Sequence, residues 1–338
     1  MFFAPFPWYY EALPTFCIQE SLAPLHPGSP LLGSLIDEWG SLFEAEVLPR
    51  MDPTSRAVLA QVNRAGRDAV RLSHAHLACA GRAVGVPLKL VDFVGSVERL
   101  AWAQSNGCPW EVRSCIYVAK GGDLQALQWA REHGCPWHEA TCCVAAFGGH
   151  LDMLEWLIAT GADVNYNSPV DGSTPLYVAA QAGHMDVVGW LIDAGADVDI
   201  ACTESGGTPL SAAAERGNTA VVGQLITSGT DVNSALTDTG ATPLLLAAQN
   251  GHTGVVAQLT ATPGVDVNKS LTDDGSTPLF VAAQNGHADV VERLLAAPGV
   301  DVNRARQNGA TPLSMALARG HEEVAQMQRA AGATEPHG

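Results

Sequence analysis

The sequence has few charged residues, few cysteines and no long apolar run. Charged residues make up only 16% of the 338 residues and hydrophobic residues 47%, so disorder of the whole chain is excluded because enough apolar surface exists to offset the entropy of folding. No apolar run reaches the roughly 18 residues that a membrane-spanning helix needs. The eight cysteines form no Cys-x-x-Cys pair, so we expect reduced thiols and no metal or other cofactor.

Basic residues are scarcer than acidic ones. The chain has 18 Lys and Arg against 35 Asp and Glu, a net charge of −17. Residues 151–338 hold 7 Lys and Arg and 21 Asp and Glu, a net charge of −14. Because affinity for phosphate backbones depends on cationic contacts, we expect no nucleic acid and no membrane as partner. We expect a cytoplasmic protein, with the nucleus as the alternative.

One tripeptide, Thr-Pro-Leu, recurs at a nearly constant period. It begins at Thr174, Thr208, Thr242, Thr277 and Thr311, at spacings of 34, 34, 35 and 34 residues. After each copy come an Ala-rich segment, a Gly, an apolar segment ending near another Gly, and a short polar stretch. A fixed period of this length is typical of a solenoid built from stacked repeats.

One unit, residues 172–199, shows what each repeat should form. Thr174 is placed to cap a helix with Pro175 at its first position. Gly183 should end that helix, and a second helix should begin near residue 184 or 185. Gly195 is then suited to the end of the second helix. Each unit is thus predicted to be a helix pair followed by a projecting hairpin.

A shorter period of 27 residues lies upstream. Trp102, Trp129 and Trp156 are 27 apart, as are the two copies of Gly-Cys-Pro-Trp at 107–110 and 134–137. These units have room for two helices, about 111–120 and 124–133 joined at Gly121-Gly122, but not for a long hairpin. They should stack on the same solenoid, and the recurring tryptophans should pack between repeats.

The units resemble ankyrin repeats, whose Thr-Pro-Leu, Ala-Ala, Gly-His and Gly-Ala-Asp-Val-Asn elements they reproduce over about 88–333. The resemblance implies an all-α fold, an α-solenoid of stacked helix-turn-helix repeats with β-hairpin loops, plus a small N-terminal helical module. We divide the chain into a Pro- and aromatic-rich arm (1–30), a helical module (31–80), short degenerate ankyrin-like repeats (88–140), ankyrin repeats (141–333) and a tail (334–338).

One position departs from the family pattern. A His commonly follows Thr-Pro-Leu, and packing should replace its hydrogen bond in some of these units, which carry Tyr177, Ser211, Leu245, Phe280 and Ser314. A different histidine position recurs once per repeat, which indicates a structural role for His150, His184, His252, His287 and His321. No phosphate loop, nucleophile elbow or His-Glu-x-x-His motif is present. We therefore expect no catalytic residues and no enzyme.

The resemblance implies a scaffold that binds another protein through hairpin tips and the exposed side of the first helices. At the tips these residues are Asn167, Asp171, Thr203, Glu204, Thr237, Asp238, Thr272, Asp273, Asp274 and Arg306. On the first helices they are Tyr177, Gln181, Glu215, Arg216, Gln249, Asn250, Gln284, Asn285 and Arg319. Asp171, Glu204, Asp238, Asp273 and Asp274 should form an acidic rim that favours a neutral or basic partner. The alternative role for the excess acid is solubility alone.

Residues 42–70 resemble an F-box, the segment that docks substrate receptors onto cullin-type ubiquitin ligases. The features that match are Val47, Leu48 and Met51 before Asp52-Pro53, then an apolar helix through Val62. This resemblance implies an alternative function, a substrate receptor that binds a cullin-ligase linker protein through Val47, Leu48 and Met51. The competing interpretation is that these helices only cap the solenoid.

A single substitution separates the two interpretations. If Leu48 contacts a linker protein, Leu48→Asp abolishes linker binding in a pull-down with purified linker while circular dichroism shows the repeats still folded. If the helices are a cap, the substitution unfolds the array, or purified linker does not bind residues 1–80.

Overall fold

The computed structural model describes residues 96–105, 109–111 and 113–334. The arm at 1–30 and the F-box-like segment at 42–70 lie outside these residues, so the receptor role stays a prediction. The described helices from residue 114 onward all belong to one compact unit.

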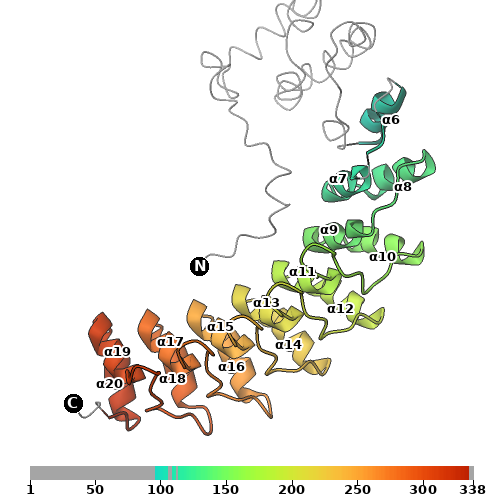
Figure 1. Cartoon of the computed structure of the whole chain (residues 1–338). Coiled ribbons are helices and arrows are strands. Elements are labelled where there is room, and N and C mark those ends of the chain that lie inside the picture. Colours follow the sequence, from blue (N-terminus) through green and yellow to red (C-terminus); the bar gives the residue numbers. More distant parts are fainter. Residues whose placement is uncertain (1–95, 106–108, 112, 335–338) are drawn as a thin grey trace, which may run out of the picture. The chain divides into compact units, whose positions relative to one another are not determined.

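The described residues form helices and turns without a strand (Figure 1). The helices are α6 (Val97–Ser105), α7 (Ser114–Lys120), α8 (Leu124–Glu132), α9 (Ala140–Gly148), α10 (Leu151–Ala159), α11 (Pro175–Ala182), α12 (Met185–Asp193), α13 (Pro209–Arg216), α14 (Thr219–Thr227), α15 (Pro243–Asn250), α16 (Thr253–Ala261), α17 (Pro278–Asn285), α18 (Ala288–Leu295), α19 (Pro312–Arg319) and α20 (Glu322–Ala330). The all-α solenoid is confirmed.

The helices pair and stack in two layers. The first helices of successive repeats, α7, α9, α11, α13, α15, α17 and α19, each pack on the next, and the second helices from α12 to α20 do the same (Figure 1). In one unit the core comprises Ala179 and Ala180 of α11 with Val188 and Leu191 of α12, all fully buried. The small alanines allow close helix approach, and the larger side chains of the second helix fill the space.

In each of the five Thr-Pro-Leu units, the first helix begins after a threonine cap and ends at a glycine. The Thr174 hydroxyl accepts a hydrogen bond from the backbone N–H of Tyr177, with Pro175 at the first helical position. Gly183 follows with φ of 84°, in the left-handed region that favours glycine. The same cap recurs in the four later Thr-Pro-Leu units. The local predictions from the motif are therefore confirmed.

The connecting loops close as tight turns. In one of them the Cys202 N–H donates to the Gly207 carbonyl at 2.9 Å, and the Gly206 N–H donates to the Cys202 carbonyl at 3.0 Å. Two such bonds close the turn but are too few for paired strands. The expected hairpins are thus present in the described residues as hydrogen-bonded turns.

The recurring histidines connect adjacent repeats. His184 Nε2 lies 2.9 Å from the carbonyl oxygen of Phe147, near the end of α9, the first helix of the preceding repeat. His252 and His287 make the same contact, to Glu215 and Gln249. Helix-end carbonyls have no intrahelical donor, so these bonds satisfy groups that would otherwise lack one. The structural role predicted for the recurring histidines is confirmed at His184, His252 and His287.

The loops carry a second connection, made by asparagine. Asn233 Nδ2 donates to the Gly264 carbonyl at 2.8 Å, and its Oδ1 accepts from the Asp266 N–H at 2.8 Å. Asn268 repeats the pattern one unit later. Each asparagine therefore fixes the spacing between its loop and the next.

The short upstream repeat forms the predicted helix pair, α7 and α8, joined through Gly121-Gly122. The first helix starts at Ser114, three residues later than expected. The Ser114 hydroxyl instead accepts a hydrogen bond from the N–H of Glu111 at 2.8 Å, which closes a turn before the helix begins.

Substitution of Gly217 tests the contact between a helix end and the next histidine. Gly217 has φ of 76°, and a Cβ there would lie 2.6 Å from His252 Nδ1. Gly229 has φ of 86° with nothing within 4 Å of such a Cβ. We expect Gly229→Ala to lower the free energy of unfolding by about 1 kcal/mol through backbone strain alone. Gly217→Ala should lower the free energy of unfolding by a larger amount, and urea denaturation measures both changes.

The double variant Gly217→Ala/His252→Ala provides the control. If the extra cost arises from the clash with His252, the double variant loses less stability than the two single variants combined. Equal losses at Gly217 and Gly229 would contradict the predicted clash.

Candidate protein-interaction surface

The loop tips form a continuous edge. The N–H of Thr203 donates to the carbonyl of Asp171 at 2.9 Å, and the N–H of Thr237 donates to Ser205 at 2.8 Å. Thr272 and Gln307 continue the series with Thr239 and Asp274. Backbone-to-backbone bonds thus hold each tip against its neighbour. The edge can present side chains at regular intervals without large movement between them.

Most of the predicted tip residues are exposed. The exposed ones are Asn167, Thr203, Glu204, Thr237, Asp238, Thr272 and Asp273, while Asp171, Asp274 and Arg306 are half-buried. Three of the five expected rim carboxylates are engaged within the protein, and one of them, the exposed Asp238, accepts only from the Thr239 hydroxyl at 3.1 Å. Asp171 accepts from the N–H and hydroxyl of Ser173, and Asp274 forms an ion pair with Arg306.

The setting of Asp274 explains its charge state. Burial alone would raise the pKa of this carboxyl, but hydrogen bonds from Ser276 and the Arg306 guanidinium lower it below its usual value. Arg306 also lies over the Phe280 ring, 4.9 Å from the ring centroid. Asp274 and Arg306 therefore act together as a structural pair between neighbouring tips. Glu204, Asp238 and Asp273 remain as exposed rim carboxylates.

The predicted residues of the first helices are less uniform. Arg216, Gln249, Asn250, Asn285 and Arg319 are exposed, and Tyr177, Gln181, Glu215 and Gln284 are half-buried. Burial, with Cys202 and Glu215 nearby, raises the pKa of the Tyr177 hydroxyl. Tyr177 is therefore held within the repeat more than it is offered to a partner.

A second row of carboxylates follows the ends of the second helices. Asp231 and Asp266 are exposed, and Oδ1 of each accepts the N–H of the asparagine two residues later. The equivalent aspartates of the other full repeats make the same turn, at Asp163, Asp197 and Asp301. In the sequence, the Asp-Val-Asn segment that contains these aspartates stands out only as a feature of the repeat. Its regular exposure could have identified it as a surface.

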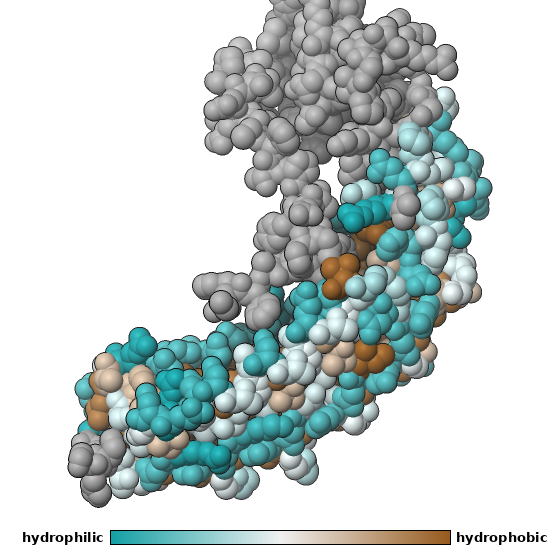
Figure 2. Space-filling view, in the orientation of Figure 1, coloured by the Kyte–Doolittle hydropathy of each residue, from teal (hydrophilic) through white to brown (hydrophobic). Residues whose placement is uncertain are grey.

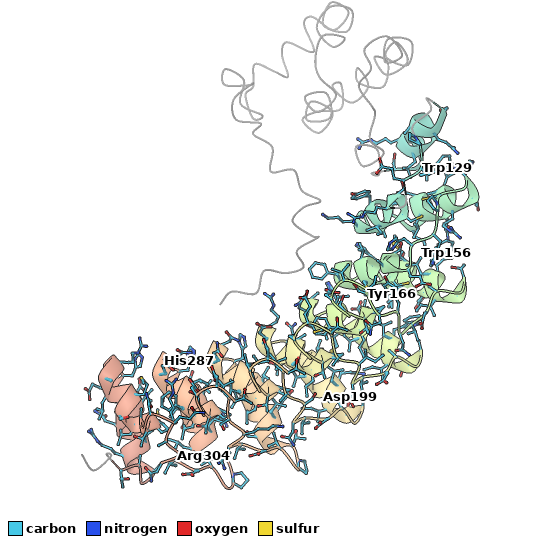
Figure 3. All side chains as sticks on the ribbon, viewed as in Figure 1. Trp129, Trp156, Tyr166, Asp199, His287 and Arg304 are labelled. Atoms are coloured by element: carbon cyan, nitrogen blue, oxygen red, sulfur yellow. The ribbon has the colours of Figure 1, made fainter. Side chains whose placement is uncertain are left out.

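Negative charge on the array is largely uncompensated. The one ion pair that joins two described residues is that of Arg306 with Asp274. Figure 2 shows that the visible face of the repeats is mostly hydrophilic, with separated apolar spots. Figure 3 places Asp199 among the loops and His287 near the turn between α17 and α18. The carboxylates of the loops are thus available to a cationic partner.

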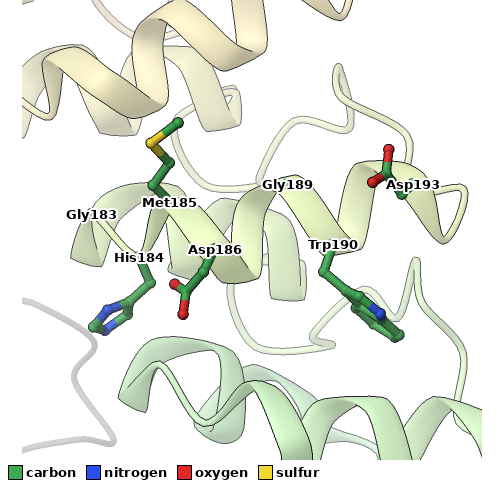
Figure 4. A pocket seen from close by; sticks show the side chains of 7 residues that line it. All are labelled: Gly183, His184, Met185, Asp186, Gly189, Trp190 and Asp193. Atoms are coloured by element: carbon green, nitrogen blue, oxygen red, sulfur yellow. The ribbon is translucent and has the colours of Figure 1, made fainter.

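The outer face of α12 carries a shallow groove that sequence reasoning missed. It is lined by Gly183, His184, Met185, Asp186, Gly189, Trp190 and Asp193. In Figure 4 the side chains of Asp186 and Trp190 lie on one side of the helix and those of Met185 and Asp193 on the other. Gly189, between them, has no side chain to fill the space. Met185 is 49% exposed, which is unusual for a large apolar residue in this array.

Comparison between repeats shows that α12 alone among the described second helices combines a glycine with a following tryptophan, since α10 carries Glu155 before Trp156 and α14 carries Gly223 before Gln224. The residue at the position of Met185 is Thr219 in α14 and Thr253 in α16, and Trp190 is replaced there by Gln224 and Gln258. Because α14 and α16 fold with threonine and glutamine at these positions, the fold does not require Met185 or Trp190. Trp190 lies half-buried along the groove.

Chemical features of other kinds are sparse in the described residues. They hold no group of three or more His, Cys, Asp or Glu side chains arranged for a metal ion. None of the helices in this part of the chain combines the length and apolar character required to cross a membrane.

Comparison with known families covers most of the array. Family models of ankyrin repeats match the chain, one for many copies at 142–192 and one for three copies at 199–271 and 244–327. No curated protein matches the sequence. The short repeat at α7 and α8 lies outside these matches, although it packs on α9 in the manner of the others. The helix pairing, the caps and the family matches together show that the chain belongs to the ankyrin repeat family.

Proposed function

We propose that this chain is a scaffold that binds a basic segment of another protein through its loop edge and the groove on α12. Ankyrin repeats are in general non-catalytic modules for protein–protein interaction, and we propose a cytoplasmic location. The observation that supports a basic partner is the row of exposed carboxylates on successive loops, which form no ion pair with other described residues.

The negative charge of the loops should affect the rate at which a basic partner associates more than the final affinity. Exposed carboxylates gain little from one cation each, but a row of them creates a negative potential that attracts a cationic segment from a distance. A basic partner therefore associates faster and loses this advantage as salt screens the field. Neutral surfaces of the first helices, such as Gln249 and Asn250, do not oppose it.

The groove on α12 adds a local site for a Lys or Arg side chain. The face of the Trp190 ring attracts a cation, and Asp186 on the same side of the helix offers a carboxylate. Met185, exposed on the other side of the helix, offers a separate apolar contact to the same segment. The indole and carboxylate on one side of α12 thus suit a cationic side chain better than an acidic or small one.

Selection from a random-peptide display library tests the preference directly. With the full chain as bait, selected sequences should be enriched in Lys and Arg and depleted in Asp and Glu. A synthetic selected peptide that occupies the groove should bind Trp190→Ala about 3- to 10-fold more weakly, the equivalent of about 1 kcal/mol for a cation–π contact. Trp156→Ala, the equivalent position of α10, serves as the matched control. Selected peptides without basic enrichment would contradict the proposal.

Charge reversal separates the loop edge from net charge. We expect Glu204→Lys/Asp273→Lys to weaken binding of the same peptide about 3- to 10-fold, with the difference vanishing at high salt. Glu132→Lys/Glu292→Lys changes net charge equally, on exposed positions of α8 and α18. Equal weakening by both pairs, in titrations by isothermal calorimetry, would assign the effect to overall charge and refute a specific edge.

A further inference from the structure

Two buried thiols face each other within the short repeat. Cys115 lies in the first turn of α7, and Cys135 follows the end of α8 by three residues. Their sulfur atoms are 2.7 Å apart, and the residues are 0% and 2% exposed. A disulfide bond is about 2.05 Å long, so the backbone already holds the two sulfurs close to bonding distance.

The pairing is absent from the neighbouring repeats. The position of Cys115 is occupied by Cys142 in the next repeat and by Leu176 in the one after, which is the Leu of Thr-Pro-Leu. The position of Cys135 is occupied by Ala162 and then by Ala196. The fold therefore needs only an apolar contact here. Sulfur at both positions is a property of this repeat alone among those described.

The two thiols have different acidities. The hydrogen bond from Cys135 lowers the pKa of the Cys115 thiol, assisted by the Arg131 charge against the effect of burial. The pKa of Cys135 is raised by the same hydrogen bond and by burial. Arg131 is held at this loop because its Nη1 donates to the Cys135 carbonyl at 3.0 Å. Cys115 is thus the nucleophile of the pair, and Cys135 the resolving thiol.

Cys142 and Cys143 do not share this setting, and the third other described cysteine, Cys202, lies 3.0 Å from the Ser205 hydroxyl oxygen. Burial raises the pKa of Cys142 to about 12 and raises that of Cys143 as well. Both are buried in α9 without a sulfur partner. Reactivity of a thiol follows its thiolate fraction, so these two should stay reduced under conditions that oxidise Cys115.

We propose that Cys115 and Cys135 are a site of reversible oxidation that forms an intramolecular disulfide with a hydroperoxide as oxidant. The Cys115 thiolate attacks the O–O bond of hydrogen peroxide, and a sulfenic acid forms on Cys115 with release of water. The Cys135 sulfur then displaces the sulfenic oxygen, which leaves as a second water. Overall, two thiols and one peroxide give one disulfide and two waters. A small dithiol reverses the step by thiol–disulfide exchange.

The bond would tie α7 to the loop that leads from α8 towards α9. Gly134, next to Cys135, is exposed, and Pro136 and Trp137 are half-buried, so peroxide has a short path to the pair once this loop opens. The inference is independent of the partner proposed above, because it concerns a repeat outside the loop edge and the groove.

Peptide mapping of the full-length protein tests the site. The reduced protein is treated with hydrogen peroxide, its free thiols are alkylated, and it is digested and analysed by mass spectrometry. We expect one linked peptide pair joining Cys115 to Cys135, which disappears on treatment with dithiothreitol. Cys142 and Cys143 should be recovered in alkylated form.

Two variants use residues that neighbouring repeats already hold at these positions, so each is expected to fold, as circular dichroism checks. Cys135→Ala should give no linked peptide and should leave a sulfenic acid on Cys115 that dimedone traps. Cys115→Leu should give neither product. A linked peptide that joins Cys115 to any other cysteine, a link between two copies of the chain, or full alkylation of both thiols after peroxide would overturn the proposal.

Discussion

The array depends on side chains that reach from one repeat to main-chain groups of the next. The last carbonyls of a short helix have no donor within the helix, and leaving them unsatisfied at a repeat junction would be costly. His184, His252 and His287 supply that donor from the start of the following second helix. Because each bond crosses a repeat boundary, the stability of one unit depends on the presence of its neighbour.

The exceptions to this pattern preserve its chemistry. Asn218 stands where the other repeats have histidine, and its Nδ2 donates to the carbonyls of both Ala180 and Gln181. Asp199 stands where the loops have asparagine. Its carboxylate accepts from the Asp231 N–H but has no hydrogen to donate, and the Thr230 hydroxyl provides a further donor to it. Each departure is compatible with the fold because a hydrogen bond across the boundary is retained.

The periodic part of the structure could be predicted from the sequence because its causes are local. Thr-Pro-Leu fixes a helix start, and a glycine with positive φ fixes a helix end. Other contacts replace the histidine that commonly follows Thr-Pro-Leu. As expected, Leu245 and Phe280 are fully buried at this position, and the Ser211 hydroxyl donates to the Thr208 carbonyl. These outcomes follow from residues a few positions apart.

The candidate surface was only partly predictable because exposure depends on residues far away in sequence. Asp274 and Asp273 are adjacent, yet only Asp274 meets an arginine, 32 residues further on. The groove on α12 arises from the absence of a side chain at Gly189, which a search for functional residue types passes over. Comparing equivalent positions between repeats would have found it, since no other described second helix combines a glycine with a following tryptophan.

A repeat protein offers its own internal control for separating fold from function. Where every unit carries the same residue, the shared backbone geometry is sufficient to explain it, as with the histidines at the repeat junctions. Where one unit differs while its neighbours fold with ordinary residues, the fold gives no reason for the difference. The combination of Gly189 with Trp190 is of this second kind, and so is the pair of Cys115 and Cys135. Selection for a partner or for chemistry is therefore best sought at these aperiodic positions, which the regular repeats hold on a rigid support.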